Sequence, residues 1–539
     1  MSHHQGWSEQ GRIPFRLRIG VTGHRRLDDE EALAGQVGRA LERVKELLPA
    51  SPYTRVLFTV VSPLAEGADR LVAREVLKNE GADLEVPLPL PREEYVRDFQ
   101  SDESKREFDN LLSQAREVME LGPSESPEEA YERVGHYVVG RCDVLIALWD
   151  GQLSKGQGGT AEIVQYARDR EVPLFWIATK GQHEIAEELG NGINAVPFQQ
   201  LDEYNRPKIA SEHFEQQVRV REHELATAAE RSAVRPTPVQ ALLEWVSPYY
   251  VRADLLAQRY QTWYYALANA VFLFAAAAVA AAASQILFAP ETPELVCIEV
   301  GLMAGLVLVV IVGRWWRLHD RWLSYRFLAE RFRSVLFLAL SGLGGQRRSG
   351  VDRASLGHPS EEWLRRAYLE VWSRRPEAAV TESDVEGLRE FLAEAWIRDQ
   401  IKYHEKMSRK YHGRDHRLTR ATEVLFGATV LAALLHVFGV AGHASPGSLS
   451  WAILFVLLAI ALPALGAAIS AIRTQREYSR NSERFGRMAH YLAGISARLE
   501  GAPDMETVRA IAAEAEDLMF DENRDWFVVM RFHPIELHV

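Results

Sequence analysis

Four long apolar runs constrain this 539-residue chain more than any other feature of its sequence. They lie at about residues 264–288, 295–313, 424–441 and 449–472. Each approaches the ~20 residues that an α-helix needs to cross the apolar core of a bilayer. A buried helix of a soluble core is the alternative, and it fits best for the third run, which is short and contains His436. We predict that all four runs span a membrane.

The charges beside these runs predict their orientation. Basic residues flank the first and second pairs of runs: Arg252, Arg259, Arg314, Arg317, Arg321, Arg326, Arg409, Lys410, Arg414, Arg417, Arg420, Arg473, Arg476, Arg480 and Arg484. The short loops inside each pair, APETPE and GHASPGSLS, contain no Lys or Arg. Because basic flanks stay in the cytoplasm, we expect two hairpins with outward turns and with both chain termini cytoplasmic.

The two hairpins also look duplicated. The motif Tyr-x4-Glu-Arg-Phe begins at Tyr325 after the first hairpin and at Tyr478 after the second. A basic residue followed by tyrosine precedes each hairpin, at Tyr260 and Tyr411. An offset of about 150 residues at both ends is typical of a repeat. Each repeat is predicted to contain a cytoplasmic helix, two membrane-spanning helices and a second cytoplasmic helix.

The first 200 residues have a different pattern, in which short apolar strands alternate with helices. Strands are expected at Leu17–Val21, Val56–Val61, 82–91, Val144–Trp149 and 171–179. Strands that are apolar throughout are typical of a parallel sheet covered by helices on both faces. The predicted fold is therefore a doubly wound, Rossmann-like α/β domain, followed by an all-α membrane region with four transmembrane helices in two hairpins.

These patterns divide the chain into five regions: a nucleotide-binding domain at 1–200, a linker and polar helix at 201–244, a first hairpin unit at 245–345, linker helices at 346–394, and a second hairpin unit with the C-terminal tail at 395–539. The first residues lack the apolar segment of a signal peptide, so the first domain is expected in the cytoplasm. Cys142 and Cys297 show no disulfide or metal-ligand spacing.

Three loops that follow predicted strands are candidates for a phosphate site. Ligands of open parallel sheets bind beyond the carboxyl ends of the strands, where the strand order reverses. Glycines allow the backbone to approach phosphate, Thr160 begins a helix whose N-terminus attracts anions, and Arg25 and Arg70 could pair with phosphate charge. Ordinary glycine turns are the alternative for any one loop. The candidate nucleotide-binding residues are Gly20, Thr22, Gly23, His24, Arg25, Ser62, Glu66, Gly67, Asp69, Arg70, Trp149, Asp150, Gly158, Gly159, Thr160 and Glu162.

A further segment, LPLPREEYVRDF, contributes Tyr95, Asp98 and Phe99 near the end of the third strand. These side chains could line a base or ribose pocket. The favoured alternative is the start of a helix with a packed aromatic residue. The pattern gives no metal site and no cofactor.

The first domain resembles a known family. RIGVTGHR, SPLAEGADRLVA, CDVLIALWDG and GQGGTAEIVQYA are similar to motifs of the SLOG superfamily, whose Rossmann-like fold is shared by DprA/Smf proteins and LOG phosphoribohydrolases. This resemblance covers residues 14–180. The hairpins resemble SLATT domains, two-span membrane effectors found beside SLOG and nucleotide-synthase sensors in bacterial conflict systems. That resemblance covers 245–345 and 395–530 and depends on layout more than on motif.

The sequence departs from LOG enzymes at one position. Their catalytic glutamate lies three residues after the motif threonine, where this chain has Ile163. Glu162 lies only two residues after Thr160, and on a helix the two positions point ~100° apart. The partner arginine has only a near match in Arg133. We assign no catalytic residue, and Glu162 either holds a ribose hydroxyl or complements the helix dipole.

The resemblance implies an effector of antiphage or abortive-infection defence in the bacterial cytoplasmic (inner) membrane. Its SLOG domain would bind a nucleotide-derived second messenger and would gate or assemble a pore from several copies of the chain. Its partners would be that small molecule, the lipid bilayer and further copies of itself. The rival interpretation is a membrane-anchored nucleotide N-glycosidase or phosphoribohydrolase. A DprA-like binder of single-stranded DNA fits poorly with a net charge of -12, so no nucleic acid partner is expected.

Overall fold

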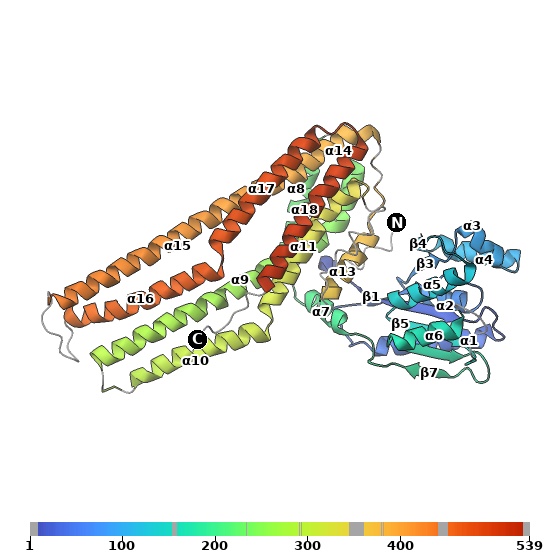
Figure 1. Ribbon diagram of the computed structural model, residues 1–539, viewed down its shortest axis with the longest axis horizontal. Helices are drawn as coiled ribbons and strands as arrows, with labels where there is room; N and C mark the ends of the chain where they lie inside the picture. Colours follow the sequence, from blue (N-terminus) through green and yellow to red (C-terminus); the bar gives the residue numbers. More distant parts are fainter. Residues whose placement is uncertain are drawn as a thin grey trace. The chain divides into compact units, whose positions relative to one another are not determined.

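The computed structural model describes residues 9–152, 159–232, 234–289, 291–292, 294–343, 361–378, 380, 382–439 and 451–531 (Figure 1). The chain divides into two units, which are treated separately below. The first consists of Met1–Lys208 together with Arg353–Ser373, and the second consists of Ile209–Asp352 together with Arg374–Val539. The chain therefore passes between the units three times.

A seven-stranded sheet forms the centre of the first unit, in the order β4-β3-β2-β1-β5-β6-β7. The strands are β1 (Phe15–Gly23), β2 (Val56–Val61), β3 (Asp83–Leu88), β4 (Glu117–Glu120), β5 (Val144–Trp149), β6 (Leu174–Ala178) and β7 (Ile185–Glu188). All neighbouring pairs are parallel except β6 and β7. The doubly wound α/β fold expected from the sequence is confirmed. The strand order reverses between β1 and β5, which is where such folds bind ligands.

Helices cover both faces of this sheet. Alternate side chains of a strand point to opposite faces, and every side chain of β5 is buried. The helices of the unit are α1 (Glu30–Glu46), α2 (Ala68–Leu77), α3 (Arg92–Tyr95), α4 (Asp102–Ser113), α5 (Pro127–Arg141), α6 (Thr160–Asp169), α7 (Val196–Asn205) and α13 (Glu362–Ser373), with short 3-10 turns η1 (Glu9–Gly11) and η2 (Val96–Asp98). The edge strands β4 and β7 were not expected from the sequence, because they are short and mostly polar.

The second unit is helical among its described residues. Its elements are α8 (Ser211–Arg231), α9 (Pro236–Phe288), α10 (Glu294–Trp315), α11 (Leu318–Leu340), η4 (Glu382–Asp384), α14 (Val385–Phe391), the π-helix η5 (Leu392–Arg398), α15 (Asp399–Val437), α16 (Trp451–Gln475), α17 (Tyr478–Glu500) and α18 (Met505–Arg531). The tail through Arg531, which the sequence left unassigned, is the end of α18.

Four of these helices are long and apolar enough to cross a membrane: α9, α10, α15 and α16. The four predicted runs correspond to these four helices over their described residues, apart from the last two described residues of the third run, which follow α15. Large apolar side chains such as Leu308 and Phe426 are 60% and 69% exposed. An apolar surface of this kind is unfavourable in water and is favourable against lipid tails. The described residues therefore contain four candidate membrane-spanning helices, as expected.

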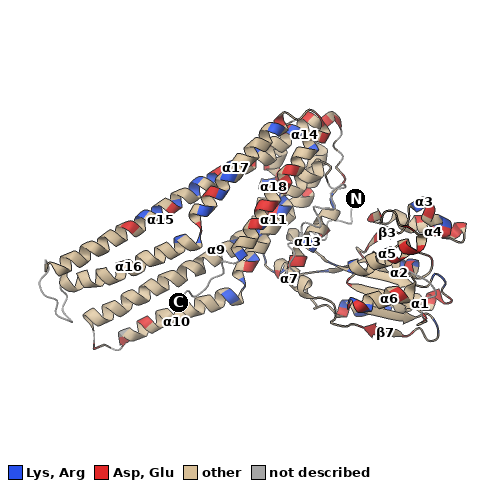
Figure 2. Ribbon diagram, in the orientation of Figure 1, with Lys and Arg blue, Asp and Glu red and all other residues tan. Residues whose placement is uncertain are grey.

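The two hairpins point in the same direction. In Figure 1 the C-terminal ends of α9 and α15 lie at the same end of the helical unit, next to the beginnings of α10 and α16. Figure 2 shows mostly uncharged residues along these parts of the helices, whereas Lys and Arg gather toward α11 and α17. In a bilayer the C-terminal ends of α9 and α15 would therefore lie on one side and the basic residues on the other.

A backbone break ends each hairpin. Arg317 and Glu477 have φ values of 48° and 45°, a left-handed conformation that is uncommon for residues other than glycine. Each break is followed by a 23-residue helix, α11 or α17. The break redirects the chain where the apolar run ends, so that the next helix can leave the membrane region.

The repeat is less regular than the sequence motif indicates. The breaks at Arg317 and Glu477 are 160 residues apart, whereas the Tyr-x4-Glu-Arg-Phe motifs are 153 residues apart. Tyr478 is the first residue of α17, but Tyr325 lies seven residues into α11. Seven residues are about two helical turns, so the motif keeps nearly the same helix face at a different depth.

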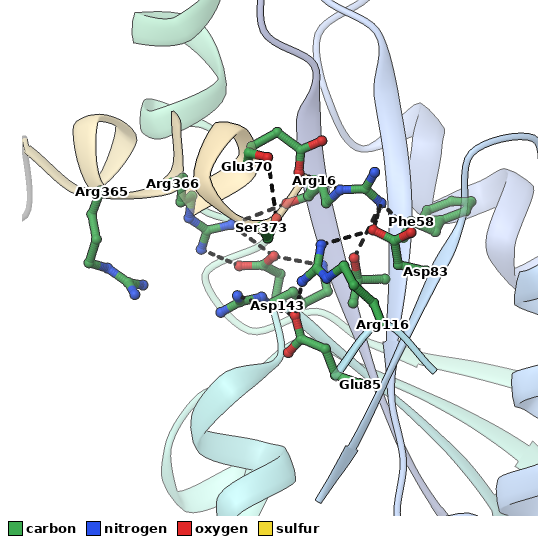
Figure 3. A network of polar contacts seen from close by, with 12 residues as sticks. Arg16, Phe58, Asp83, Glu85, Arg116, Asp143, Arg365, Arg366, Glu370 and Ser373 are labelled. Atoms are coloured by element: carbon green, nitrogen blue, oxygen red, sulfur yellow. Dashed lines mark hydrogen bonds and ion pairs between the residues drawn. The ribbon is translucent and has the colours of Figure 1, made fainter. Parts of the chain in front are cut away.

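Helix α13 belongs to the α/β unit, although it lies in sequence between the two hairpins. Its Arg366 guanidinium donates two hydrogen bonds to Asp143, at 2.9 and 2.5 Å, just before β5 (Figure 3). Its Glu370 accepts a hydrogen bond from Arg16 near the start of β1. Burial raises the pKa of Asp143, but Arg366 and Arg18 together lower it by more, so the net direction is down. Asp143 therefore stays ionised and holds α13 at the amino ends of the strands.

The predicted membrane topology can be tested with single cysteines in a C297S background. Thr292 is exposed between α9 and α10, and Glu212 is exposed on α8. In intact spheroplasts, T292C should react with a membrane-impermeant maleimide, whereas E212C should react only after permeabilisation. Cys142 should stay silent, because burial raises the pKa of its thiol to about 12. Labelling of E212C but not T292C in intact spheroplasts would reverse the orientation.

Candidate functional site

A pocket of about 660 Å³ lies at the carboxyl ends of β1 and β5, where the strand order reverses. It brings together residues from all three loops that the sequence singled out. The predicted residues that line it are Thr22, Gly23, His24, Arg25, Asp69, Trp149, Asp150, Gly159 and Thr160. The three loops thus form one site.

The remaining predicted residues lie elsewhere. Those outside the pocket lining are Gly20, Ser62, Glu66, Gly67, Arg70 and Glu162. Gly158 lies outside the described residues. Arg70 is 2% exposed, and it donates hydrogen bonds to the Leu64 carbonyl at 3.0 Å and the Ser104 carbonyl at 2.9 Å. Glu66 accepts hydrogen bonds from Ser104 and from the Gln100 amide. Arg70 and Glu66 therefore fasten the second loop to α4.

Close packing of the chain accounts for three of the glycines. A Cβ on Gly23 would lie 2.6 Å from the Leu148 carbonyl oxygen, and one on Gly67 would lie 2.5 Å from the His24 carbonyl oxygen. A Cβ on Gly20 would lie 2.7 Å from the Cys142 sulfur. Gly67 also has a φ of 78°, which favours glycine. These glycines bring the strand ends together, whether or not a phosphate binds.

The N-terminus of α6 opens into the pocket. Gly159 precedes the helix in an extended conformation, and no side chain among the described residues caps this end. Gly159, Thr160 and Ala161 all line the pocket. The first backbone amides of a ten-residue helix and its dipole favour an anion here, and the Thr160 hydroxyl adds a further donor.

Asp150 organises the opposite wall. Its carboxylate lies 2.9 Å from the Lys180 ammonium and 3.0 Å from Nε2 of His24. The hydrogen bond from Lys180 is the main cause that holds the pKa of Asp150 well below its ordinary value. Asp150 is therefore ionised, and it holds Lys180 and His24 at the pocket edge. Lys180 lies two residues after the end of β6, so its position after a strand was a signal in the sequence that was missed.

An aromatic wall completes the pocket. Tyr95 and Tyr131 line it, and the Arg25 guanidinium lies 5.2 Å from the centre of the Tyr131 ring. Tyr95 is 1% exposed and packs edge-on against Phe99, with ring centres 5.2 Å apart. Tyr95 is therefore a packed aromatic residue, as favoured from the sequence, and it also lines the pocket. Tyr131 lies within α5, away from any strand end, and no local pattern pointed to it.

Ile163, three residues after Thr160, lies in the wall of the pocket. Its side chain lines the pocket and is 3% exposed, and it packs against Gly135 of α5 so closely that a Cβ there would lie 2.3 Å away. Glu162 is not part of the lining. The wall at this position is therefore apolar.

The comparisons bear on the second hairpin. Residues 393–526 match a family described as SMODS and SLOG-associating 2TM effector domain 1, SLATT_1. The match runs from η5 through α15, α16 and α17 into α18. No curated protein matches the chain. Together with the four apolar helices, the match suggests a membrane protein and an effector of conflict systems.

Asp69 makes stability depend on pH. Burial raises the pKa of its carboxyl to about 7, from 3.8 in an ordinary environment. Between these values the folded chain holds a proton that the unfolded chain has lost, so stability falls as pH rises toward 7 and then levels off. From pH 5.5 to 7 the loss should be about 2 kcal/mol.

Hydrogen exchange of the β2 and α2 amides, corrected for intrinsic rates, measures this loss. Asp69→Asn should remove it, whereas Asp102→Asn on the surface of α4 should preserve it. The same pH dependence in Asp69→Asn as in the unsubstituted protein would contradict the assignment.

Proposed function

We propose that this protein is a membrane effector of a bacterial defence system, in which the α/β unit binds a nucleotide-derived signal and controls the helical unit. The observation that carries the proposal is the pocket at the strand-order reversal, within a unit that also holds α13. The similarity of 393–526 to SLATT effector domains supports the membrane role. The SLOG-like character of the first unit and the SLATT-like character of the first hairpin are part of this proposal.

The pocket suits a phosphate-bearing nucleotide. Its volume of about 660 Å³ falls within the range of small-molecule sites. The N-terminus of α6 would take a phosphate, and Arg25 and Lys180 would balance its charge. Tyr95, Tyr131 and Trp149 offer aromatic surface for a base. The arrangement favours a nucleotide over an apolar ligand.

Binding without hydrolysis is the favoured activity. Hydrolysis of an N-glycosidic bond in the LOG manner would need a carboxylate where Ile163 lies. The carboxylates that line the pocket are engaged, since Asp150 contacts Lys180 and Asp69 accepts a hydrogen bond from the Ala65 amide at 3.2 Å. The rival activity would therefore require Glu162 to turn into the pocket.

Helix α13 supplies the connection to the membrane helices. The chain enters it after the first hairpin and leaves it before the second, and we propose that a shift of α13 is passed on to both. A ligand that binds two arrangements of the α/β unit unequally would shift their populations. Four membrane-spanning helices in one chain are too few to surround a wide aqueous path, so we propose that several copies form the pore.

Ligand binding is tested by a pair of neighbouring arginines. Arg25 lines the pocket, whereas Arg26 does not. Calorimetry of the full-length protein with cyclic oligonucleotides and ADP-ribose derivatives should find a ligand. Arg25→Gln should weaken it about tenfold through loss of a charge-assisted hydrogen bond, and Arg26→Gln should change it less than twofold. No free base should be released; release would favour the rival hydrolase, and equal losses in both variants would place the site elsewhere.

The coupling between ligand binding and ion leakage is tested by a second pair of neighbouring arginines. Arg366 reaches Asp143 before β5, whereas its neighbour Arg365 pairs with Glu362 on the same helix. In proteoliposomes loaded with ions, ligand should cause leakage with a sigmoidal dose response. Arg366→Gln should preserve ligand affinity but cut this leakage severalfold, and Arg365→Gln should leave both unchanged. Full leakage from a folded Arg366→Gln protein would show that α13 does not transmit the signal.

A further inference from the structure

A second polar cavity lies inside the helical unit, separate from the nucleotide pocket. Its volume is about 530 Å³, and its lining comes from α9 and α11 of the first repeat and from α15, α17 and α18 of the second. Six basic side chains line it among the described residues: Arg326, Arg333, Lys410, Arg414, Arg476 and Arg484. Only two carboxylates in that part of the chain do so, Glu330 and Glu522.

The two carboxylates form ion pairs with three of the six basic side chains. Glu330 pairs with Arg326 and lies 2.9 Å from Arg333, and Glu522 lies 2.6 Å from Arg484. Burial raises the pKa of Glu330, but the nearby basic side chains, chiefly Arg326 and Arg333, together lower it below its ordinary value, so Glu330 stays ionised. The cavity therefore has no further carboxylate for the other cations.

Lys410, Arg414 and Arg476 remain without an ion pair in the described part of the chain. Arg476 lies over the Tyr265 ring and donates a hydrogen bond to Asn269 at 3.2 Å, but both groups are neutral. Lys410 is exposed to water, whereas Arg414 and Arg476 are only partly exposed where they line the cavity, so their like charges repel one another unless an anion enters. The excess of positive charge around the cavity thus favours a negatively charged occupant.

Buried donors point to the same occupant. Nε of Arg476, Nε of Arg484 and the Trp396 indole N–H are buried and have no acceptor within the described residues. Each belongs to a side chain that lines the cavity, and Trp396 is 1% exposed. These groups can only donate, so a molecule rich in acceptor oxygens would satisfy them. Water would supply acceptors, but it would leave the charge uncompensated.

We propose that this cavity binds a phosphate group at the junction of the two hairpins. A phosphate combines negative charge with several acceptor oxygens, and arginine guanidiniums match its geometry. Arg414 precedes the third apolar run and Arg476 follows the fourth, so the cavity is level with the cytoplasmic ends of the membrane-spanning helices. Either the headgroup of an anionic lipid or a soluble phosphate could therefore supply the group.

The test uses full-length protein purified in a neutral detergent. Native mass spectrometry with phosphatidylglycerol against phosphatidylcholine detects a lipid occupant, and calorimetry with inorganic phosphate detects a soluble one. Binding in either arm supports the site and identifies its source. The absence of binding in both arms overturns it.

Matched variants separate the cavity from general attraction to anions. R414Q/R476Q removes two cavity cations and should weaken binding at least about tenfold. R417Q/R480Q removes the same charge from α15 and α17 outside the cavity lining and should change binding less than twofold. Equal losses in the two variants overturn the site. If circular dichroism shows that R414Q/R476Q is unfolded, Arg414→Gln alone is decisive, and unchanged affinity in that folded protein overturns the proposal.

Discussion

The ion pair between Arg366 and Asp143 is the contact on which the proposed link between ligand and membrane depends. Asp143 directly precedes β5 and Asp150 directly follows it, so a single strand carries the anchor of α13 at one end and the pocket at the other. β1 repeats this arrangement, with Arg16 near its start and His24 after its end. Six residues of strand span ~20 Å, so both sites share one stiff path through the sheet.

The energetics of this pair favour an all-or-none anchor. Arg366 and Asp143 side chains are 24% and 14% exposed, so both charges are largely removed from water. Breaking a buried pair by removing one partner costs about 3 to 5 kcal/mol, chiefly because the other charge remains buried. Glu370 adds a second contact to the anchor, since it pairs with the buried guanidinium of Arg16. Helix α13 therefore either stays docked or leaves with several charges exposed together, which suits a two-state element.

Local patterns predicted the parts of the structure that local patterns control. β1, β2 and β5 and the four apolar helices follow from runs of apolar residues, and Thr22, Arg25, Asp150 and Thr160 line the pocket because parallel strands end at the same edge. Local patterns do not reveal contacts between residues that are distant in the sequence. Arg70 follows a glycine loop as a phosphate ligand would, yet it is buried, where it contacts Ser104 and Glu107. Tyr131 and α13 reach their places only through tertiary packing.

The basic residues beside the apolar runs show why a sequence pattern can carry two meanings. Arg414, Arg417, Arg476 and Arg480 all predict a cytoplasmic flank, and charge alone cannot distinguish them. The structure separates them: Arg414 and Arg476 line the internal cavity, whereas Arg417 and Arg480 are exposed. Outward cations are enough to orient a hairpin and lose little energy in water. Inward cations are costly unless something neutralises them. The inward pair is therefore better explained by an occupant of the cavity than by orientation alone.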